Sequence, residues 1–267
     1  MSQVEAVIFD WAGTMVDFGS LAPVRAVTES FARYGVAISD EDVRRDMGIY
    51  KKDHIRRILQ MPHVEQQWRA RAGKAPNEKD VETLFAEFQP AQMQVLASYS
   101  TLIPGAARIA GELRNRGVKI GSTTGYTRPM LDVLVTSAAE QGYRPDLALC
   151  PDDAGGGRPL PWMCLTIALQ FRVSSVACVV KVGDTVSDIE EGRNAGMWTI
   201  GVSRTGNGIG MSEAEFDALG PEEQLLRISS AAECLRSAGT HYVVENACDI
   251  QPALDDINAR LAAGQRP

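Results

Sequence analysis

Short apolar runs alternate with helical patterns along most of the chain. The runs are four to seven residues long and end beside Gly, Asp, Ser, Thr or Glu, as buried strands do. They occupy residues 4–9, 118–122, 176–182, 198–202 and 241–244, and helical patterns such as 105–116 and 250–261 lie between or after them. Strands separated by helices form βαβ units. The pattern therefore predicts an α/β fold with a parallel sheet.

One long segment breaks this alternation. Between Leu21 and Ser98 the apolar positions recur three and four residues apart, which indicates helices, and no strand pattern occurs. Asn77 stands where it can cap a helix whose apolar face includes Leu84 and Phe88. We therefore predict a core domain of residues 1–20 and 100–267, with an all-helical cap domain of residues 21–99 inserted after the first strand.

Composition and charge exclude several classes of protein. Of the 267 residues, 45% are hydrophobic and 23% are charged, which is typical of a folded globular chain. The formal net charge of −7 argues against binding to nucleic acid or to an anionic membrane, since both need a basic surface. No apolar run approaches the roughly 20 residues that span a bilayer, and the N-terminus lacks a signal-peptide pattern. The five cysteines form no CxxC pair, so we expect buried, reduced thiols and a cytoplasmic location.

Polar side chains follow three of the predicted strands. Asp10 ends the first, Thr124 follows the second, and Asp184 and Asp188 follow the third, where it passes into a helix. Ligands of an open parallel sheet bind at the carboxyl ends of its strands. Two carboxylates there indicate a hard cation such as Mg²⁺, and a hydroxyl can hydrogen-bond a phosphoryl oxygen. Asp also caps turns and favours helix N-termini, and this alternative explains Asp188 better than Asp184.

These strand ends, in this order, resemble those of the haloacid dehalogenase (HAD) superfamily. Its members have a strand that ends in Asp, a strand that ends in Thr, an isolated basic residue and a GDxxxD motif, and the basic residue here is Arg158. The resemblance implies a Rossmann-like parallel-sheet core with an inserted helical cap. It also implies Mg²⁺ as the cofactor and Asp10 as a nucleophile that forms an aspartyl-phosphate.

Residue 12 departs from the pattern of the superfamily's phosphatases. Those enzymes carry an Asp there as a general acid, whereas this chain has Ala12, which cannot donate a proton. The predicted cap offers different chemistry, because Lys51 and His54 lie three residues apart, on one face of a helix. A lysine with a lowered pKa forms a Schiff base with a carbonyl substrate. Without further context, however, a lysine in a Lys-Lys pair is usually a solvated surface group.

Longer strings resemble one family within the superfamily, the phosphonoacetaldehyde hydrolases or phosphonatases. FDWAGT, MGxxKxxH, STTGYTRPM, GRPxPWM and KVGDTVSDIEEGRNAGMW occur in the family's order over nearly the full length. The resemblance implies hydrolysis of phosphonoacetaldehyde to acetaldehyde and phosphate. Lys51 would condense with the aldehyde, and the protonated imine would accept the electrons of the carbon–phosphorus bond. Asp10 would take the phosphoryl group, and this scheme requires no acid at residue 12.

The same resemblance implies roles for the other motif residues. Asp10, Asp184 and the backbone carbonyl of Ala12 would hold Mg²⁺. Thr124 and Arg158 would bind phosphoryl oxygens, and Asp188 would order Arg158 or a metal-bound water. Further contacts with the substrate or its protons would come from Met47, Gly48, His54, Gly125 and Tyr126.

Two other functions stay open on the sequence alone. A phosphatase that acts on a small phosphomonoester would not need Lys51, and a non-catalytic module would bind phosphorylated ligands without turnover. The phosphonatase resemblance implies a small phosphonate substrate and a homodimer formed through the cap, and the negative net charge predicts no nucleic-acid or membrane partner.

Overall fold

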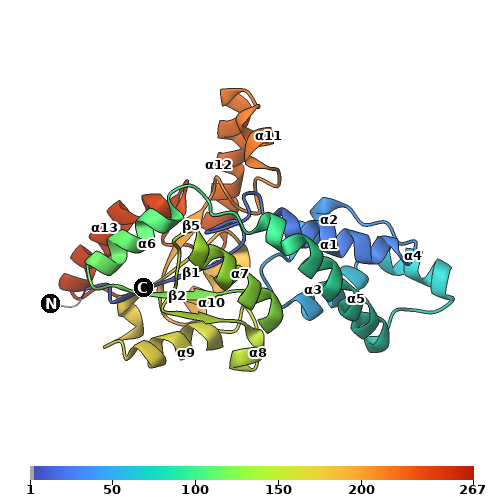
Figure 1. The fold of residues 1–267 in the computed structure, drawn as a ribbon, viewed down its shortest axis with the longest axis horizontal. Coiled ribbons are helices and arrows are strands. Elements are labelled where there is room, and N and C mark those ends of the chain that lie inside the picture. Colours follow the sequence, from blue (N-terminus) through green and yellow to red (C-terminus); the bar gives the residue numbers. More distant parts are fainter. Residues whose placement is uncertain (1–2) are drawn as a thin grey trace.

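A single parallel sheet of six strands forms the centre of the molecule in the computed structural model, which describes residues 3–267 (Figure 1). The strand order is β3-β2-β1-β4-β5-β6. The strands are β1 (Ala6–Phe9), β2 (Lys119–Thr123), β3 (Leu147–Leu149), β4 (Val179–Gly183), β5 (Trp198–Val202) and β6 (Tyr242–Val244). The predicted α/β fold with a parallel sheet is confirmed.

Five of the strands coincide with runs that the apolar pattern predicts, although β2 and β4 each end one residue later, and two larger details differ. The pattern does not predict β3, which is three residues long and has only one fully buried residue. The apolar pattern predicts strand throughout the run 176–182, but its first three residues form the short 3₁₀ helix η2 (Val176–Cys178). There the Ser175 hydroxyl accepts a hydrogen bond from the N–H of Ala177 at 3.2 Å, so a side-chain cap replaces strand pairing.

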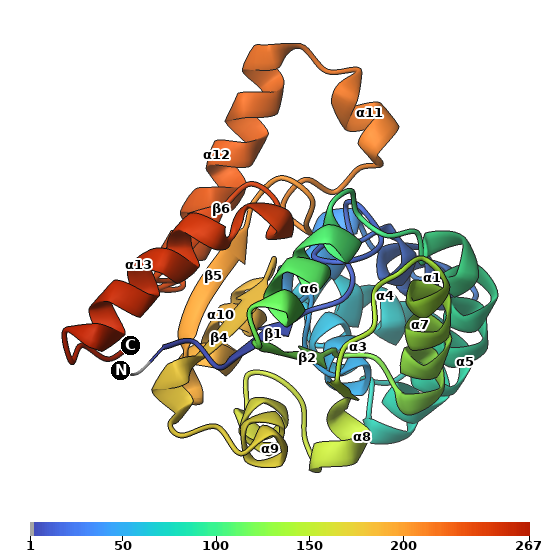
Figure 2. The same cartoon turned by 60° about the vertical axis from the view of Figure 1, so that its left-hand side comes forward.

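Helices cover both faces of the sheet. In β1, Val7 and Phe9 pack in one apolar cluster with α6 (Ala106–Asn115), α7 (Arg128–Glu140) and α13 (Gln251–Ala262). Ala6 and Ile8 pack in a second cluster with α9 (Trp162–Phe171), as the two-residue period of a strand requires. Helices α11 and α12 project away from the sheet as a hairpin (Figure 2). These helices are α6 (Ala106–Asn115), α7 (Arg128–Glu140), α8 (Pro151–Ala154), α9 (Trp162–Phe171), α10 (Val186–Asn194), α11 (Glu213–Asp217), α12 (Pro221–Ser237) and α13 (Gln251–Ala262), with the 3₁₀ helix η3 (Ala247–Asp249) before α13.

Residues 21–99 hold helices and no strand, and these helices lie together at one end of the molecule (Figure 1). They are α1 (Leu21–Ala32), α2 (Asp40–Arg45), α3 (Lys51–Leu59), α4 (Pro62–Ala72), α5 (Glu78–Leu96) and the 3₁₀ helix η1 (Ala97–Tyr99). Asn77 caps α5 as predicted, since its side chain accepts from the N–H of Lys79 at 2.9 Å. The division into a cap of 21–99 and a core of 1–20 and 100–267 stays a prediction, and residues 1 and 2 lie outside the described part.

The strand order creates a switch point beside β1. The chain leaves β1 toward β2 and β3, then returns to place β4 on the other side of β1. Phe9 pairs with Ser122 of β2 and with Val182 of β4, so the residues that follow these three strands meet at one edge. Open α/β sheets bind their ligands in the crevice at such a point.

Two further expectations concern the burial of the cysteines and the absence of a membrane-spanning helix. All five cysteines are free thiols, and three of them are buried as predicted. Contrary to that prediction, Cys234 is exposed, because α12 buries only Ala231, Ala232 and Leu235, and Cys248 is half-buried in η3, which buries only Ala247. Across residues 3–267 we find no helix with the length and apolar character needed to cross a membrane.

Candidate active site

The turn after β1 places Asp10 at the switch point. The N–H of Asp10 donates to the Val182 carbonyl of β4 at 2.9 Å, which extends the sheet ladder by one bond. Gly13 follows with φ of +83°, and a Cβ at that position would clash with the Asp184 carboxylate. Glycine at position 13 therefore allows this turn to pack directly against Asp184.

Strand β4 and helix α10 bring two further carboxylates to Asp10. Asp184 accepts from the Thr14 hydroxyl at 2.9 Å and from the N–H of Asn207 at 2.7 Å. Asp188 accepts from the N–H of Thr185, the N-cap residue of α10, at 3.2 Å, so it also has the capping role that the structural alternative predicts. One oxygen from each of the three aspartates lies within 4.8 Å of the others.

Arg158 lies fully buried among carboxylates. Its Nη2 is 2.7 Å from Asp10, its Nη1 is 2.9 Å from Asp188, and its Nε is 2.9 Å from Glu191. Lys181 of β4 adds a second buried cation, 2.8 Å from Asp188 and 3.4 Å from Glu191. Burial alone would lower the pKa of Arg158, but the carboxylates outweigh it and raise that pKa, so the guanidinium stays charged.

The helical segment contributes a buried amine. Lys51 begins α3 and is 2% exposed. Its Nζ donates to the Met47 sulfur at 3.4 Å and lies 5.7 Å from the ring centroid of Tyr126, and within residues 3–267 it forms no ion pair with a carboxylate. Burial lowers the pKa of Lys51 to about 8, although the nearby Asp10 carboxylate opposes this shift.

His54 lies near Lys51 on the buried face of α3. Its Nε2 is 2.7 Å from the Val43 carbonyl, and because a carbonyl can only accept, Nε2 carries the proton. The Nδ1 atom is buried and has no hydrogen-bond partner in the described part of the chain. Burial, together with the charge of Lys51, lowers the pKa of His54 to about 3, so the imidazole is neutral.

A small cavity lies between Lys51 and Asp10. Its walls come from the turns after β1 and β2, from the start of α1 and from the segment that leads into α3. The predicted site residues that line it are Asp10, Ala12, Met47, Gly48, Lys51, Thr124, Gly125, Tyr126 and Arg158. Ser20, Pro23 and Thr185 line it as well; Ser20 and Pro23 lie outside the motifs, and Thr185 lies within the GDxxxD motif at a position to which the sequence analysis assigns no role.

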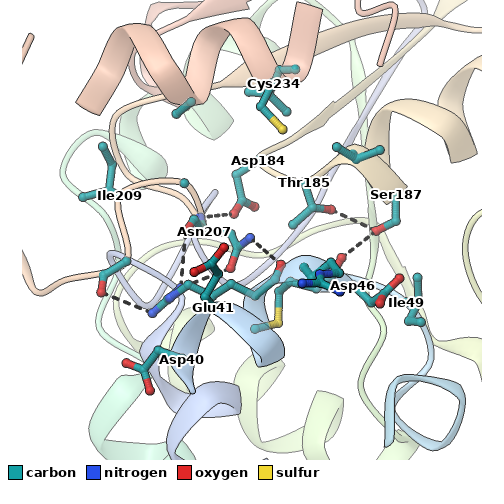
Figure 3. Close-up of a pocket in the computed structure, with 18 of the residues that line it drawn as sticks. Asp40, Glu41, Asp46, Ile49, Asp184, Thr185, Ser187, Asn207, Ile209 and Cys234 are labelled. Atoms are coloured by element: carbon teal, nitrogen blue, oxygen red, sulfur yellow. Dashed lines mark hydrogen bonds between the residues drawn. The ribbon is translucent and has the colours of Figure 1, made fainter. Parts of the chain in front are cut away.

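Three predicted site residues lie outside these walls. Asp184 is adjacent to Asp10 but lines a larger neighbouring cleft of about 790 Å³ (Figure 3). Asp188 lies against Arg158, and His54 packs inside the helical segment. These three residues can therefore act on the cavity only through a neighbouring side chain, a bound ion or a movement of the helices.

Comparison with known proteins identifies the family. Residues 4–196 match the model of the haloacid dehalogenase-like hydrolases. A phosphonoacetaldehyde hydrolase of Syntrophobacter fumaroxidans is 45% identical over 264 residues, which cover 99% of this chain and 95% of that protein. The chain belongs to the phosphonoacetaldehyde hydrolase family. A phosphonoacetaldehyde hydrolase of Paraburkholderia xenovorans is 44% identical over 267 residues, 100% of both chains.

A solved structure agrees with this membership. The crystal structure of a phosphonoacetaldehyde hydrolase-like protein from Oleispira antarctica matches with a TM-score of 0.97 at 41% identity, over 99% of this chain and 96% of that one. The family resemblance drawn from the sequence motifs is thereby confirmed, and the chain is a hydrolase of this family.

The acidic cluster of this phosphonoacetaldehyde hydrolase family member suits a divalent cation. The cluster has four carboxylates and two cations, an excess of two negative charges. Burial and the carboxylates of Asp10 and Asp188 raise the pKa of Asp184 well above its ordinary value, and burial also raises the pKa of Asp10. At Asp188, Arg158 and Lys181 outweigh burial and lower the pKa. Asp184 forms no ion pair with a cation in the described part of the chain, and Asp10 shares Arg158 with Asp188 and Glu191. These two carboxylates therefore carry the excess negative charge and can hold a metal ion.

Three residues of the polar network around Arg158 are absent from the sequence predictions. They are Thr123, Lys181 and Glu191. The hydroxyl and the carbonyl of Thr123 each accept from Arg158 Nη2 at 2.8 Å. The sequence does contain signals for Glu191 and Lys181. Glu191 follows Asp188 at helical spacing, and Lys181 interrupts an apolar strand. A lysine buried in a parallel sheet requires a carboxylate partner.

Proposed function

We propose that this chain hydrolyses the carbon–phosphorus bond of phosphonoacetaldehyde to acetaldehyde and phosphate. The observation that carries the proposal is the pairing of a buried amine, Lys51, with a carboxylate, Asp10, across one small cavity. A phosphatase would need no amine here and would need an acid at residue 12, where the chain has alanine. The names of the full-length relatives support the same reaction.

The first step is condensation of Lys51 with the aldehyde. The neutral amine attacks the carbonyl carbon, water leaves, and a protonated imine forms. A lowered pKa supports this role, because only the neutral amine is nucleophilic. Met47 and Tyr126 flank the amine and keep it away from bulk water. The neutral His54, with an unprotonated Nδ1, places no second positive charge beside Lys51 while the amine attacks, and it would be cationic only while Nδ1 held a proton of this step.

The second step is transfer of the phosphoryl group to Asp10. The Asp10 carboxylate attacks phosphorus while the electrons of the carbon–phosphorus bond move into the imine, which becomes an enamine. The leaving group needs no proton from residue 12, so Ala12 suffices. Arg158 and Thr124 bind phosphoryl oxygens. The weakest contact of the guanidinium, 3.4 Å from Nη1 to the Gly48 carbonyl, is the one that a phosphoryl oxygen would replace.

Two hydrolyses complete the cycle. Water attacks the aspartyl-phosphate and releases phosphate, which restores Asp10. The enamine takes up a proton at carbon to become an imine, and water then releases acetaldehyde and restores Lys51. The net reaction consumes one substrate and one water, because the water lost on condensation is regained when the imine is hydrolysed.

We infer that Mg²⁺ is the cation of this site, held by Asp10, Asp184 and the carbonyl of Ala12. When bound, it supplies positive charge that offsets the charge of the phosphoryl oxygens and of the carboxylates. Asp188 is the less suitable ligand, because one of its oxygens faces Arg158 and Lys181 and the other accepts from α10. Asp188 instead orders Arg158. The homodimer and the cytoplasmic location stay predictions.

An assay of both products tests the proposal. Incubation with phosphonoacetaldehyde and Mg²⁺ should release acetaldehyde and phosphate in equal amounts, and removal of Mg²⁺ with a chelator should stop both. A panel of small phosphomonoesters should release little phosphate. Rapid hydrolysis of a phosphomonoester, with no acetaldehyde from the phosphonate, would instead establish a phosphatase.

The pKa of Lys51 gives a prediction about pH. Because the folded-state pKa is about 8, the reactive neutral amine increases as pH rises through 8. Competitive acetylation of the substrate-free protein, read by mass spectrometry at Lys51, should show a midpoint near that pH. In the urea-unfolded chain the midpoint should move to about 10.4, the value of an ordinary lysine. Equal midpoints in both states would contradict the proposed activation of Lys51 by burial.

Gly48 gives a prediction about contact between the helical segment and the core. It has φ of +91°, and a Cβ would clash with the hydroxyls of Thr185 and Ser187. Gly48→Ala should push the segment with Lys51 away from α10 and lower kcat/KM about tenfold or more. Gly73→Ala is the matched control, because Gly73 has φ of +71° with nothing within 4 Å of the added methyl group. Both variants should lose about 1–2 kcal/mol of stability through backbone strain, but only Gly48→Ala should lose activity.

A further inference from the structure

Arg44, in the last turn of α2, ties the helical segment to a core loop. Its Nη1 donates to the Gly19 carbonyl at 2.9 Å and to the Asn207 side-chain oxygen at 3.1 Å, and its Nη2 donates to the Gly210 carbonyl at 3.3 Å. The Asn207 Nδ2 atom donates back to the Arg44 carbonyl at 3.1 Å. Arg44 forms no ion pair with a carboxylate within residues 3–267, so these contacts depend on the orientation of core carbonyls and one amide.

The same core loop, residues 205–210, holds Asp184. The backbone N–H of Asn207 donates to Asp184 Oδ2 at 2.7 Å, and Figure 3 shows the two residues side by side. The Thr205 hydroxyl donates to the Gly13 carbonyl at 2.7 Å, beside Asp10. Asn207 therefore contacts Arg44 through its side chain and through its carbonyl, which accepts from Nη1 at 3.3 Å, and it contacts Asp184 through its N–H.

Other contacts of the helical segment approach the cluster from the opposite side. The Ser187 hydroxyl of α10 donates to the Met47 carbonyl at 3.0 Å, and Ser187 in turn contacts the Thr185 hydroxyl at 3.0 Å (Figure 3). Residues 44–48 thus contact both core elements that flank Asp184.

We propose that Arg44 and Asn207 form a latch that couples closure of the cap to the position of Asp184. With the cap closed, Arg44 fixes Asn207 and so keeps its N–H on the Asp184 carboxylate. When the cap moves away, the loop loses the guanidinium donors and the N–H of Asn207 is no longer fixed on Asp184, which then keeps only the Thr14 hydroxyl of its two donors. Neither latch residue lines the cavity, so both are positioning residues. The proposal rests on the proposed function, in which Asp184 is a ligand of the cation.

Such a latch acts in both directions. If cap closure favours the geometry of Asp184 that binds the cation, then the cation favours cap closure by the same factor. Couplings of this kind typically change an affinity by about 5- to 150-fold. The cation would then have two effects. It would offset the charge of the carboxylates, and by favouring cap closure it would hold Lys51 against the cavity.

Titration of the substrate-free full chain with Mg²⁺ in a calorimeter tests the latch. Arg44→Met, which removes every guanidinium contact, should weaken Mg²⁺ binding about tenfold. Asn207→Ala, which keeps the backbone N–H, should weaken it in the same direction. The double variant should lose little more than Arg44→Met, because both changes break one connection. Arg45→Met is the control, since the exposed side chain of this neighbour forms no hydrogen bond or ion pair within residues 3–267, and it should bind Mg²⁺ as the parent chain does.

Amide hydrogen exchange provides a second readout that needs no metal. Exchange in residues 205–210 should accelerate at least about tenfold in Arg44→Met and stay unchanged in Arg45→Met. Unchanged Mg²⁺ affinity and unchanged exchange in Arg44→Met would overturn the latch. If the parent chain bound no Mg²⁺, the proposed cation site would fail, and the exchange of 205–210 would still decide whether Arg44 fixes the loop. Asn207→Ala gives the same decision if Arg44→Met does not fold.

Discussion

Arginine in place of Lys51 is expected to abolish cleavage of phosphonoacetaldehyde, with kcat lower by at least about four orders of magnitude. The guanidinium keeps the positive charge near Asp10 but cannot condense with an aldehyde, since it does not lose its proton in proteins. Mg²⁺ binding and the melting temperature should change little, because Lys51 has no carboxylate partner to lose in the described structure. Steady-state release of acetaldehyde measures the effect.

The adjacent lysine provides the control for this experiment. The side chain of Lys52 is 27% exposed and lies 3.4 Å from each of Glu78 and Glu82. Because exposed ion pairs contribute little free energy and arginine can replace them, Lys52→Arg should retain nearly full activity. Cleavage by the Lys51→Arg protein at a rate near that of the Lys52→Arg protein would show that the amine is not needed.

The second large effect is expected at Asp10. Asp10→Asn keeps the shape of the side chain and an oxygen that can accept from Arg158, but it removes the nucleophilic charge. Turnover should fall by several orders of magnitude, and no acid-stable phosphate should remain on the protein after a rapid quench. Product release and phosphate incorporation from labelled substrate measure both outcomes.

The stability of this variant separates lost chemistry from lost structure. Burial and Asp188 raise the pKa of Asp10, so its ionised form destabilises the metal-free cluster. Removal of that charge should leave the melting temperature without Mg²⁺ unchanged or higher, and Mg²⁺ should stabilise the variant less than the parent chain. Substantial turnover by a folded Asp10→Asn protein would exclude the aspartyl-phosphate mechanism.

The sequence predicts the part of the site that the sheet creates. Asp10, Thr124 and Asp184 follow β1, β2 and β4, which are neighbours in a parallel sheet, so strand-end residues come together without further information. Local sequence patterns also predict α5, the helix that follows Asn77, because its capping residues and apolar positions lie within one segment.

Contacts between distant segments could not be predicted in this way. The position of Lys51 opposite Asp10 depends on how α3 packs on the core, and only the family resemblance indicated it. The hydrogen bonds between Arg44 and the loop 205–210 join segments that no spacing rule connects. Strand β3 was missed because three residues are too few to show a period, although its neighbour β2 fixes its place in the sheet.

Reductive trapping tests the central claim, imine formation at Lys51, most directly. Borohydride added together with phosphonoacetaldehyde should reduce the imine to a stable secondary amine, inactivate the enzyme, and add the mass of one substrate-derived adduct to the peptide at Lys51. Borohydride without substrate should leave that peptide unchanged, and the Lys51→Arg protein should acquire no adduct there. An enzyme that stays active and unlabelled at Lys51 after borohydride treatment with substrate would contradict the account.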